Sequence, residues 1–211
     1  MTHKSQYRKD LKINPRNSIV LASKSPYKKE LIKKLNQPFI AVKPEYKEER
    51  NCPCSGGEYA EYLAEMKARS LLPKYEKSMI LSSDQVLMVG ESIFNKPGSF
   101  ENAFRQLRIM ANQTCVFYTG LAIYLPLERY FIKTYVTCEV VFRNLTDEQI
   151  RSYLKIDRPF NCAGSFMIEK AGVLLFQEIV TGDFFSLIGF PLLTFNKIIS
   201  YYPHYDFLSL D

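Results

Sequence analysis

The residues best suited to bind an anion form the segment 23–29, which reads Ser-Lys-Ser-Pro-Tyr-Lys-Lys. The segment lies between a short apolar run at residues 19–22 and a stretch with apolar residues at helical spacing. Ser25 followed by Pro26 is typical of a helix start, where free backbone N–H groups and the positive end of the helix dipole favour an anion. The segment therefore predicts a phosphate site. The alternative is an ordinary capped helix whose lysines face water.

Asp84 is the candidate for acid–base or metal chemistry. It stands within Ser-Ser-Asp-Gln at residues 82–85, inside a strand pattern that is otherwise apolar. A carboxylate in such a place needs a partner, a metal ion or exposure in a cleft. Carboxylates bind magnesium and act as general bases, so a catalytic role is one interpretation. A strand end that meets solvent is the other.

Three more charged residues gain candidate roles from their positions. Glu48 lies in a charged loop, Lys67 lies near the apolar face of a helix, and Lys96 stands beside a proline in a turn. Taken singly, each of them is explained by exposure at the surface, with the stem of Lys67 covering apolar residues. Their candidate roles therefore depend on the other motifs.

Small residues at positions 162–166 and 182–183 predict turns at which a base or a ribose could approach the backbone. The sequence contains no Walker P-loop, HExxH or GxSxG motif. Its two histidines, His3 and His204, are poorly placed for a catalytic triad. P-loop, zincin and serine-hydrolase chemistry are therefore disfavoured.

The formal charge of +6 at first suggests nucleic acid or an anionic membrane as a partner. The charge is unevenly distributed, however. Residues 1–50 contain 13 Lys and Arg against 5 Asp and Glu, whereas residues 51–211 contain 15 against 17. The positive charge belongs to the first quarter of the chain, so we expect neither a specific nucleic-acid partner nor a membrane.

Alternating strands and helices are predicted around these residues. We expect strands at 19–22, 39–42, 79–89, 115–125, 130–142 and 173–180, and helices from Pro26, at 58–72, at 100–110, from Thr146 to Leu154 and at 187–201. The fold class is α/β, with one domain at residues 18–205 built on a mixed, elongated central β-sheet flanked by helices. Residues 1–17 are expected to form a basic, mobile extension.

The location expected from the sequence is the cytoplasm. Residues 1–17 lack the apolar block of a secretory signal, and no stretch has the composition of a transmembrane helix. The five cysteines are odd in number and lack zinc-ribbon or redox spacing. We therefore interpret them as reduced thiols.

Seven blocks of residues, taken in order, resemble the Maf family of nucleoside triphosphate pyrophosphatases from residue 19 to about residue 199. Together they are far more specific than any one block. They read Leu-Ala-Ser-Lys-Ser-Pro-Tyr-Lys-Lys at 21–29, Lys-Glu at 47–48, Leu-Ala-Glu-Met-Lys-Ala at 63–68, Asp84 before Asn-Lys-Pro at 95–97, Phe-Tyr-Thr-Gly-Leu-Ala at 117–122, Cys-Ala-Gly-Ser-Phe at 162–166 and Gly-Phe-Pro-Leu at 189–192.

The resemblance implies an ITPase-like or Maf-like fold with its active site in a cleft between two lobes. It also implies hydrolysis of the α,β-phosphoanhydride of a nucleoside triphosphate, with a divalent cation (Mg²⁺, Mn²⁺ or Co²⁺), by a homodimer. Asp84 would be the proton acceptor or a metal ligand, with Glu48 helping to hold the metal. The triphosphate would be bound by Ser23, Lys28, Lys29, Lys67 and Lys96.

Among the family's branches, the sequence looks most like the one that acts on 7-methyl-GTP. Tyr27, Gln85 and Glu169 occupy positions at which the branches differ, so they would read the base. An aromatic ring and a carboxylate suit a cationic 7-methylguanine, through stacking and hydrogen bonding.

Several residues depart from the family pattern. Lys28 and Lys29 replace an arginine pair and lose its bidentate fork, Lys47 replaces an acid, and Asn95 replaces a glycine. The residues at 167–168 are apolar where the 7-methyl-GTP branch is usually polar. Two alternatives therefore stay open: a pyrophosphatase for dTTP, UTP or another modified nucleotide, and a weakened regulator that binds a nucleotide or nucleic acid.

Overall fold

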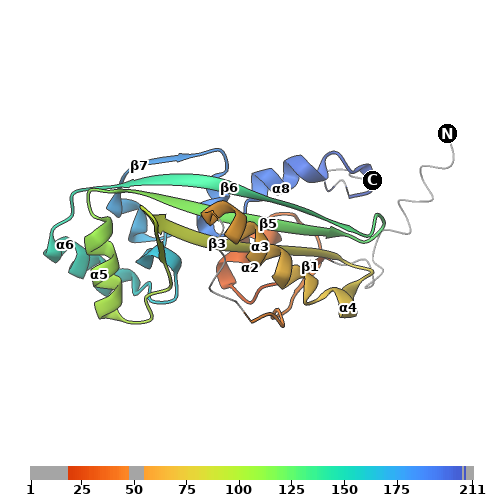
Figure 1. Cartoon of the computed structure of the whole chain (residues 1–211), viewed down its shortest axis with the longest axis horizontal. Helices are drawn as coiled ribbons and strands as arrows, with labels where there is room; N and C mark the ends of the chain where they lie inside the picture. Colours follow the sequence, from red (N-terminus) through yellow and green to blue (C-terminus); the bar gives the residue numbers. More distant parts are fainter. Residues whose placement is uncertain (1–18, 48–54, 206, 208–211) are drawn as a thin grey trace.

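The computed structural model describes residues 19–47, 55–205 and 207, and it shows one seven-stranded mixed β-sheet (Figure 1). The expected fold class is confirmed. The strand order is β2-β1-β3-β5-β6-β7, with β4 paired to β3; β1 runs parallel to β2 and β3, and the other pairs are antiparallel. The strands are β1 (Ile19–Leu21), β2 (Phe39–Ala41), β3 (Met79–Val89), β4 (Ser92–Phe94), β5 (Thr114–Leu125), β6 (Tyr130–Phe142) and β7 (Phe176–Thr181).

The long antiparallel strands β3, β5 and β6 form the body of the molecule, and helices cover the sheet along its length (Figure 1). At one end of these strands lie α5 and α6, α2 lies near their middle, and α4 lies toward the other end. The helices are α2 (Pro26–Lys33), α3 (Gly56–Arg69), α4 (Leu72–Tyr75), α5 (Phe100–Met110), α6 (Asp147–Asp157), α7 (Phe184–Ile188) and α8 (Leu192–Ile199), with 3₁₀ segments η2 (Ala163–Ser165), η3 (Ala171–Leu175) and η4 (Pro203–Tyr205).

The helix starts follow the capping residues of the sequence. The Ser25 side chain accepts a hydrogen bond from the Lys28 backbone N–H, and Pro26 is the first residue of α2. At α6, Thr146 and Gln149 form the predicted capping box in both directions. These contacts satisfy backbone N–H groups that otherwise have no partner at a helix start. Because the capping residues are only three positions from the groups they bind, both helix starts could be predicted from the sequence.

Alternate residues of the strands pack on opposite faces of the sheet. On one face, Leu21 and Leu81 share an apolar cluster with Ile32 of α2. On the other face, Val20 shares a cluster with Ala64 of α3. Successive side chains of a strand point to opposite faces of the sheet. Because helices cover both faces here, both sets of side chains are apolar, and the strands appear in the sequence as continuous apolar runs.

The α5–α6 end of the sheet has its own core, in which aromatic rings meet edge to face. The Phe166 ring lies 5.3 Å from that of Phe117 in β5 and 6.1 Å from that of Phe142 in β6. Such aromatic pairs add to the stabilisation from apolar burial. They hold the segment that follows η2 against the sheet.

The last predicted strand and helix needed correction. The strand was expected from residue 173, but residues 171–175 form η3 and β7 begins at Phe176. The helix expected at 187–201 is two helices, α7 and α8. Gly189 between them has φ of 120°, a conformation that favours glycine, and Pro191 lacks the N–H that a continuous helix would use.

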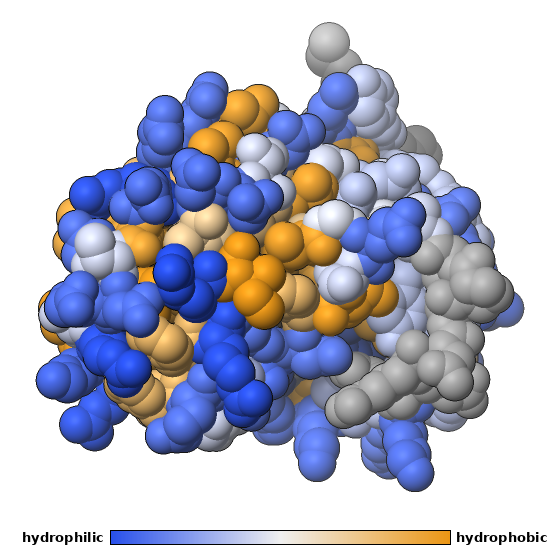
Figure 2. Space-filling view, turned by 60° about the vertical axis from the view of Figure 1, so that its left-hand side comes forward, coloured by the Kyte–Doolittle hydropathy of each residue, from blue (hydrophilic) through white to orange (hydrophobic). Residues whose placement is uncertain are grey.

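The surface exposes both charged and apolar residues. On the face shown in Figure 2, apolar side chains gather near the middle and hydrophilic side chains surround them. Within the described ranges, every helix is too short or too polar to span a lipid bilayer.

Helix α3 approaches β5 so closely that only glycine fits at position 120. A Cβ atom on Gly120 would lie 2.0 Å from the Ala60 carbonyl oxygen. Real Cβ atoms essentially never approach so closely, and the obstacle is backbone that cannot rotate away. Gly120 therefore sets the distance between α3 and the sheet.

We predict that Gly120→Ala lowers the free energy of unfolding by about 3 kcal/mol, because α3 must move away from β5. Denaturant unfolding measures this change. Gly182→Ala is the control: a Cβ atom there meets nothing within 4 Å, so we expect a change below about 0.5 kcal/mol. Equal unfolding midpoints for the two variants would contradict the close approach.

Candidate functional site

Asp84 and Lys67 form an ion pair where α3 crosses the sheet. The Lys67 Nζ lies 2.8 Å from the Asp84 Oδ2, and the two side chains are only 16% and 18% exposed. Asp84 lies opposite Gly120 in the register of β3 and β5, so the close approach of α3 brings the lysine to the carboxylate. The structure thus unites two of the sequence candidates.

Lys28 brings a second ammonium group to the same strand. Its Nζ donates a hydrogen bond of 2.6 Å to the carbonyl oxygen of Ser83, the residue before Asp84. The Ser83 hydroxyl in turn donates to the Gly189 carbonyl oxygen at 2.7 Å. The start of α2, the strand β3 and the turn between α7 and α8 therefore meet beside Asp84.

The start of α2 has the geometry of a tight capped turn. The Ser23 side-chain oxygen accepts a hydrogen bond of 3.1 Å from the Ser25 backbone N–H, so Ser23 faces the turn that precedes the helix. Lys29, on the same helix, is half-buried. The hydroxyl, the helix start and the Lys28 ammonium group form an arrangement suited to an anion.

The other charged candidates lie at different distances from this centre. Lys24 is directed to β2, since its Nζ donates to the Ala41 carbonyl oxygen at 2.8 Å. Lys96 is exposed. Burial raises the pKa of the Cys162 thiol, and the positive charge of Lys96 opposes this shift in part. Glu48 lies outside the described residues.

Tyr27 connects α2 to the segment after η2. Its hydroxyl donates to the Met167 sulfur at 3.5 Å. Burial raises the pKa of Tyr27, and the nearby Cys162 and Glu169 raise it further. Tyr27 and Glu169 therefore lie close together, although 142 positions separate them in the sequence.

Glu169 is exposed as a residue, but its carboxyl group sits against the protein. Desolvation raises the pKa of Glu169, and the neighbouring Lys170 partly opposes that shift. A raised pKa indicates that a negative charge at this position lacks full stabilisation. A cationic or hydrogen-bond-donating ligand would supply what the carboxylate lacks.

Gln85, which was expected to read the base, also forms hydrogen bonds that link helices and strands. Its Nε2 donates to the Ser186 carbonyl oxygen at 3.0 Å and lies 3.3 Å from the Thr119 Oγ1 and from the Leu187 carbonyl oxygen. The Thr119 hydroxyl also donates to the Ser186 carbonyl oxygen, at 3.0 Å. These bonds tie the end of α7 to β3 and β5.

Together these residues form two neighbouring groups that share α2. Lys28 reaches the backbone of Ser83, the residue before Asp84, whereas the preceding residue, Tyr27, reaches Met167 and the surroundings of Glu169. One group is cationic with a single carboxylate, and the other combines an aromatic ring with an acid. A ligand with a polyphosphate at one end and a base at the other matches this pair of groups.

Three residues with a part in this arrangement were not predicted. Ser83 stood beside Asp84 in the sequence, and Gly189 stood in a quoted block, but nothing local indicated that they bond to each other. Asp157, the last residue of α6, is buried near Tyr27 and Glu169. Nothing in the sequence indicated Asp157, because this helix was expected to end at Leu154, whereas α6 continues to Asp157.

A single carboxylate is a workable metal ligand here. Among the described residues, no three His, Cys, Asp or Glu side chains lie close enough together to hold a metal ion. Magnesium, however, is commonly held by one or two carboxylates together with substrate phosphates and water. Asp84, beside ammonium groups that attract phosphate, fits that pattern.

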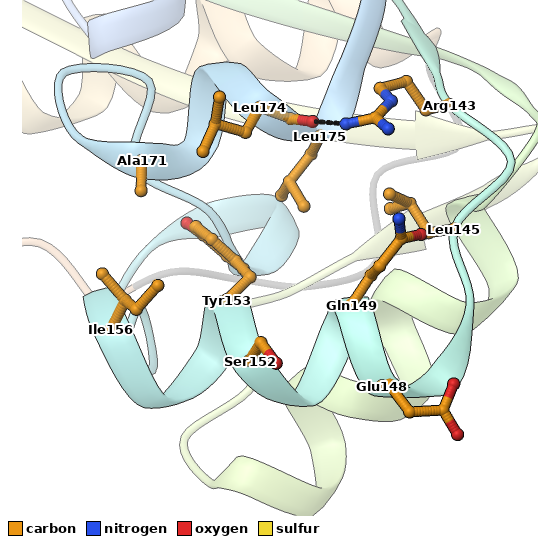
Figure 3. Close-up of a pocket in the computed structure, with 10 residues that line it drawn as sticks. All are labelled: Arg143, Leu145, Glu148, Gln149, Ser152, Tyr153, Ile156, Ala171, Leu174 and Leu175. Atoms are coloured by element: carbon orange, nitrogen blue, oxygen red, sulfur yellow. Dashed lines mark hydrogen bonds between the residues drawn. The ribbon is translucent and has the colours of Figure 1, made fainter.

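A pocket of about 310 Å³ lies apart from this centre, between α6 and η3 (Figure 3). Leu175, Ile156 and the ring of Tyr153 line it, and the Arg143 guanidinium donates to the Leu174 carbonyl oxygen at its rim. Neither Asp84 nor Lys67 lines this pocket. The sequence candidates therefore belong to a different place in the fold.

The chain is similar to proteins of one known family. The model of the family described as Maf-like protein matches residues 18–201. A 7-methyl-GTP pyrophosphatase from Syntrophotalea carbinolica is 38% identical over 188 residues, covering 89% of this chain and 94% of that protein. One of the same description from Vibrio parahaemolyticus is 40% identical over 178 residues, covering 83% and 90%.

Among solved structures, a HAM1 protein from Coxiella burnetii aligns with a TM-score of 0.49 at 14% identity, over 88% of this chain and 99% of that one. The family model covers most of the described residues, including every described site candidate from Ser23 to Glu169. The chain therefore belongs to the Maf family.

Proposed function

We propose that this protein is a nucleoside triphosphate pyrophosphatase acting on 7-methylated GTP. It hydrolyses the anhydride bond between the α- and β-phosphates and releases the nucleoside monophosphate and pyrophosphate. The observation that carries the proposal is the Lys67–Asp84 ion pair with the Lys28 ammonium group at the adjacent residue of β3. Relatives that share most of the chain are described as 7-methyl-GTP pyrophosphatases, which supports the substrate.

In the proposed reaction, Asp84 accepts a proton from the attacking water. Lys67, bonded to one carboxylate oxygen, holds the carboxylate in a fixed orientation. Water attacks phosphorus, the anhydride oxygen leaves with pyrophosphate, and the proton stays on Asp84 until it is lost to solvent. Lys28, Lys29 and Lys96 neutralise the charge that develops on the leaving group.

A divalent cation (Mg²⁺, Mn²⁺ or Co²⁺) belongs to the proposal, and Asp84 and Glu48 would hold it together with the phosphates of the substrate. When bound, such an ion polarises a phosphoryl oxygen and lowers the pKa of a coordinated water. The residues of the chain then orient the triphosphate and receive the proton.

Tyr27 and Glu169 form the proposed base site. The Tyr27 ring is fixed by the contact of its hydroxyl with the Met167 sulfur, so it can stack on a base without further ordering. The carboxylate of Glu169 faces the donor edge of a guanine whose positive charge comes from the 7-methyl group. Gln85 supports this site by fixing α7 against β3.

The proposal includes a cytoplasmic location and a homodimer. The described cysteines Cys115, Cys138 and Cys162 are free thiols. Burial raises the pKa of Cys115 to about 12 and that of Cys138 to about 11, so both stay protonated and unreactive. Reduced, inert thiols suit a reducing compartment.

We predict that Asp84→Asn lowers kcat for 7-methyl-GTP by about 10³-fold because the proton acceptor is lost. Release of pyrophosphate measures turnover with Mg²⁺ or Mn²⁺ present. Glu91→Gln, which removes one exposed carboxylate from a turn, is the matched control and should leave kcat unchanged. Wild-type protein that hydrolyses no triphosphate in a nucleotide panel would contradict the proposed function.

Lys28→Gln and Lys24→Gln form a matched pair within one loop and helix start. Lys28 reaches the strand of Asp84 whereas Lys24 reaches β2. We expect Lys28→Gln to raise KM for the triphosphate by about 10-fold or more, the size of one lost charge-assisted hydrogen bond. Lys24→Gln should change KM less than about twofold. Steady-state kinetics decide the matter, and equal effects of the two variants would count against the phosphate site.

Tyr27→Ala should weaken binding of 7-methyl-GMP by about 10-fold or more through loss of stacking on the base. Tyr27→Phe should keep most of that affinity, because the ring stays. Isothermal titration with 7-methyl-GMP measures both. Inhibition by inorganic pyrophosphate is the internal control and should be the same for both variants. A Tyr27→Ala variant that binds the nucleotide normally would remove this residue from the base site.

A further inference from the structure

Gln106 of α5 bridges two segments that carry candidate site residues. Its Oε1 accepts a hydrogen bond of 2.6 Å from the Ser165 hydroxyl, and its Nε2 donates one of 2.8 Å to the Asn95 carbonyl oxygen. Ser165 belongs to residues 162–169, here called the base segment, and Asn95 belongs to residues 95–98, here called the phosphate loop. One side chain thus contacts both segments.

The chemistry of the two partners fixes the orientation of the Gln106 amide. The Asn95 carbonyl oxygen can only accept a hydrogen bond, so the amide NH₂ group must face it, and the amide oxygen accepts from Ser165. Gln106 is half-buried and stands beside the fully buried Leu107 on α5. An apolar side chain could pack at such a position, whereas only a group with both a donor and an acceptor can make this bridge.

Ser165 is held in a conformation that residues with a Cβ atom seldom adopt. Its φ is 59°, in the left-handed region, and its side chain is fully buried. The hydrogen bond to Gln106 gives this buried hydroxyl a partner and helps to hold the backbone. From here the base segment continues to Met167, whose sulfur receives the Tyr27 hydroxyl, and to Glu169. Gln106 therefore fixes the start of that segment.

Helix α5 holds the phosphate loop on both sides of Lys96. The Asn102 Nδ2 donates to the Pro97 carbonyl oxygen at 2.9 Å, and Gln106, about one turn further along the helix, binds the Asn95 carbonyl oxygen. The two carbonyl groups that flank Lys96 are therefore tied to one helix. This arrangement fixes the backbone from which the Lys96 ammonium group extends.

We propose that Gln106 is a positioning residue that sets the separation between the phosphate loop and the base segment, so that both ends of one nucleoside triphosphate are bound together. The inference rests on the proposed function and deepens it, because it names the residue that matches the site to the length of the substrate. Gln106 acts through its two partners and takes no part in the attack on phosphorus.

Positioning of this kind affects the whole substrate more than its parts. The α,β-anhydride bond divides 7-methyl-GTP into 7-methyl-GMP and pyrophosphate. Each product can bind in its own part of the site even if the two parts shift relative to each other. The intact triphosphate must engage both parts at the separation that its covalent bonds impose. Loss of the bridge should therefore weaken binding of the triphosphate and change binding of the products little.

The test is isothermal titration of the full chain with three ligands in the presence of Mg²⁺. They are 7-methyl-GMP, pyrophosphate and the α,β-methylene analogue of 7-methyl-GTP, in which a carbon link replaces the bond that water would cleave. We expect Gln106→Met to weaken the analogue by about 10-fold, the size of two lost hydrogen bonds, and each product by less than twofold. The bonds from Asn102 and from the Gly98 N–H to the Phe160 carbonyl oxygen still hold the loop.

Gln113→Met is the matched control, because it makes the same change at an exposed glutamine just beyond α5. It should leave all three affinities unchanged. Ser165→Gly breaks the bridge from its other end, and the φ of 59° suits glycine, so this variant keeps the fold. We expect Ser165→Gly to weaken the analogue by about fivefold, each product by less than twofold, and the analogue by less than twofold when Gln106→Met is already present.

Equal weakening of all three ligands by Gln106→Met and by Ser165→Gly would show that the bridge only supports the structure, and it would overturn the proposal. So would unchanged binding of the analogue, or an effect of Ser165→Gly that is the same with and without Gln106→Met. A wild-type protein that binds the analogue no more tightly than 7-methyl-GMP would do the same. None of these measurements needs turnover, so a protein that binds the analogue as expected but hydrolyses no triphosphate would contradict the proposed function alone.

Discussion

The ion pair between Lys67 and Asp84 is the interaction on which the candidate site depends. Both side chains are more than four-fifths buried, so removing either one would leave the other charge poorly solvated. The pair forms because α3 lies directly on β5 at Gly120, which faces Asp84 in the sheet. The absence of one side chain at Gly120 therefore allows a lysine on a helix and a carboxylate on a strand to meet.

Helix α2 joins the two parts of the site. Its consecutive residues Tyr27 and Lys28 extend to different partners, the Met167 sulfur and the Ser83 carbonyl oxygen. Neighbouring residues on a helix point about 100° apart, so one helix can contact both ends of an elongated ligand. Among the lysines in the first quarter of the chain, Lys28 is directed to β3 and Lys24 to β2. The total charge therefore does not tell where each lysine is directed, which depends on its position in the fold.

Much of the fold could be predicted because its signals are local. Ser25 and Thr146 mark helix starts through hydrogen bonds to backbone groups only three residues away, and the apolar runs mark buried strands. The prediction was wrong where a tertiary contact prevailed. One expected helix is broken at Gly189, whose carbonyl oxygen receives the Ser83 hydroxyl.

The sequence by itself determined the element types, the mixed α/β class and the identity of most candidate residues, since these follow from capping, periodicity and the order of short motifs. Only the tertiary structure decided which candidates meet. It brought Lys67 to Asp84 and Tyr27 to the segment of Met167 and Glu169, and it directed Lys24 elsewhere. The reason is physical: these contacts join residues far apart in the chain, and their distances are set by the packing of helices on the sheet, which no local pattern of residues records.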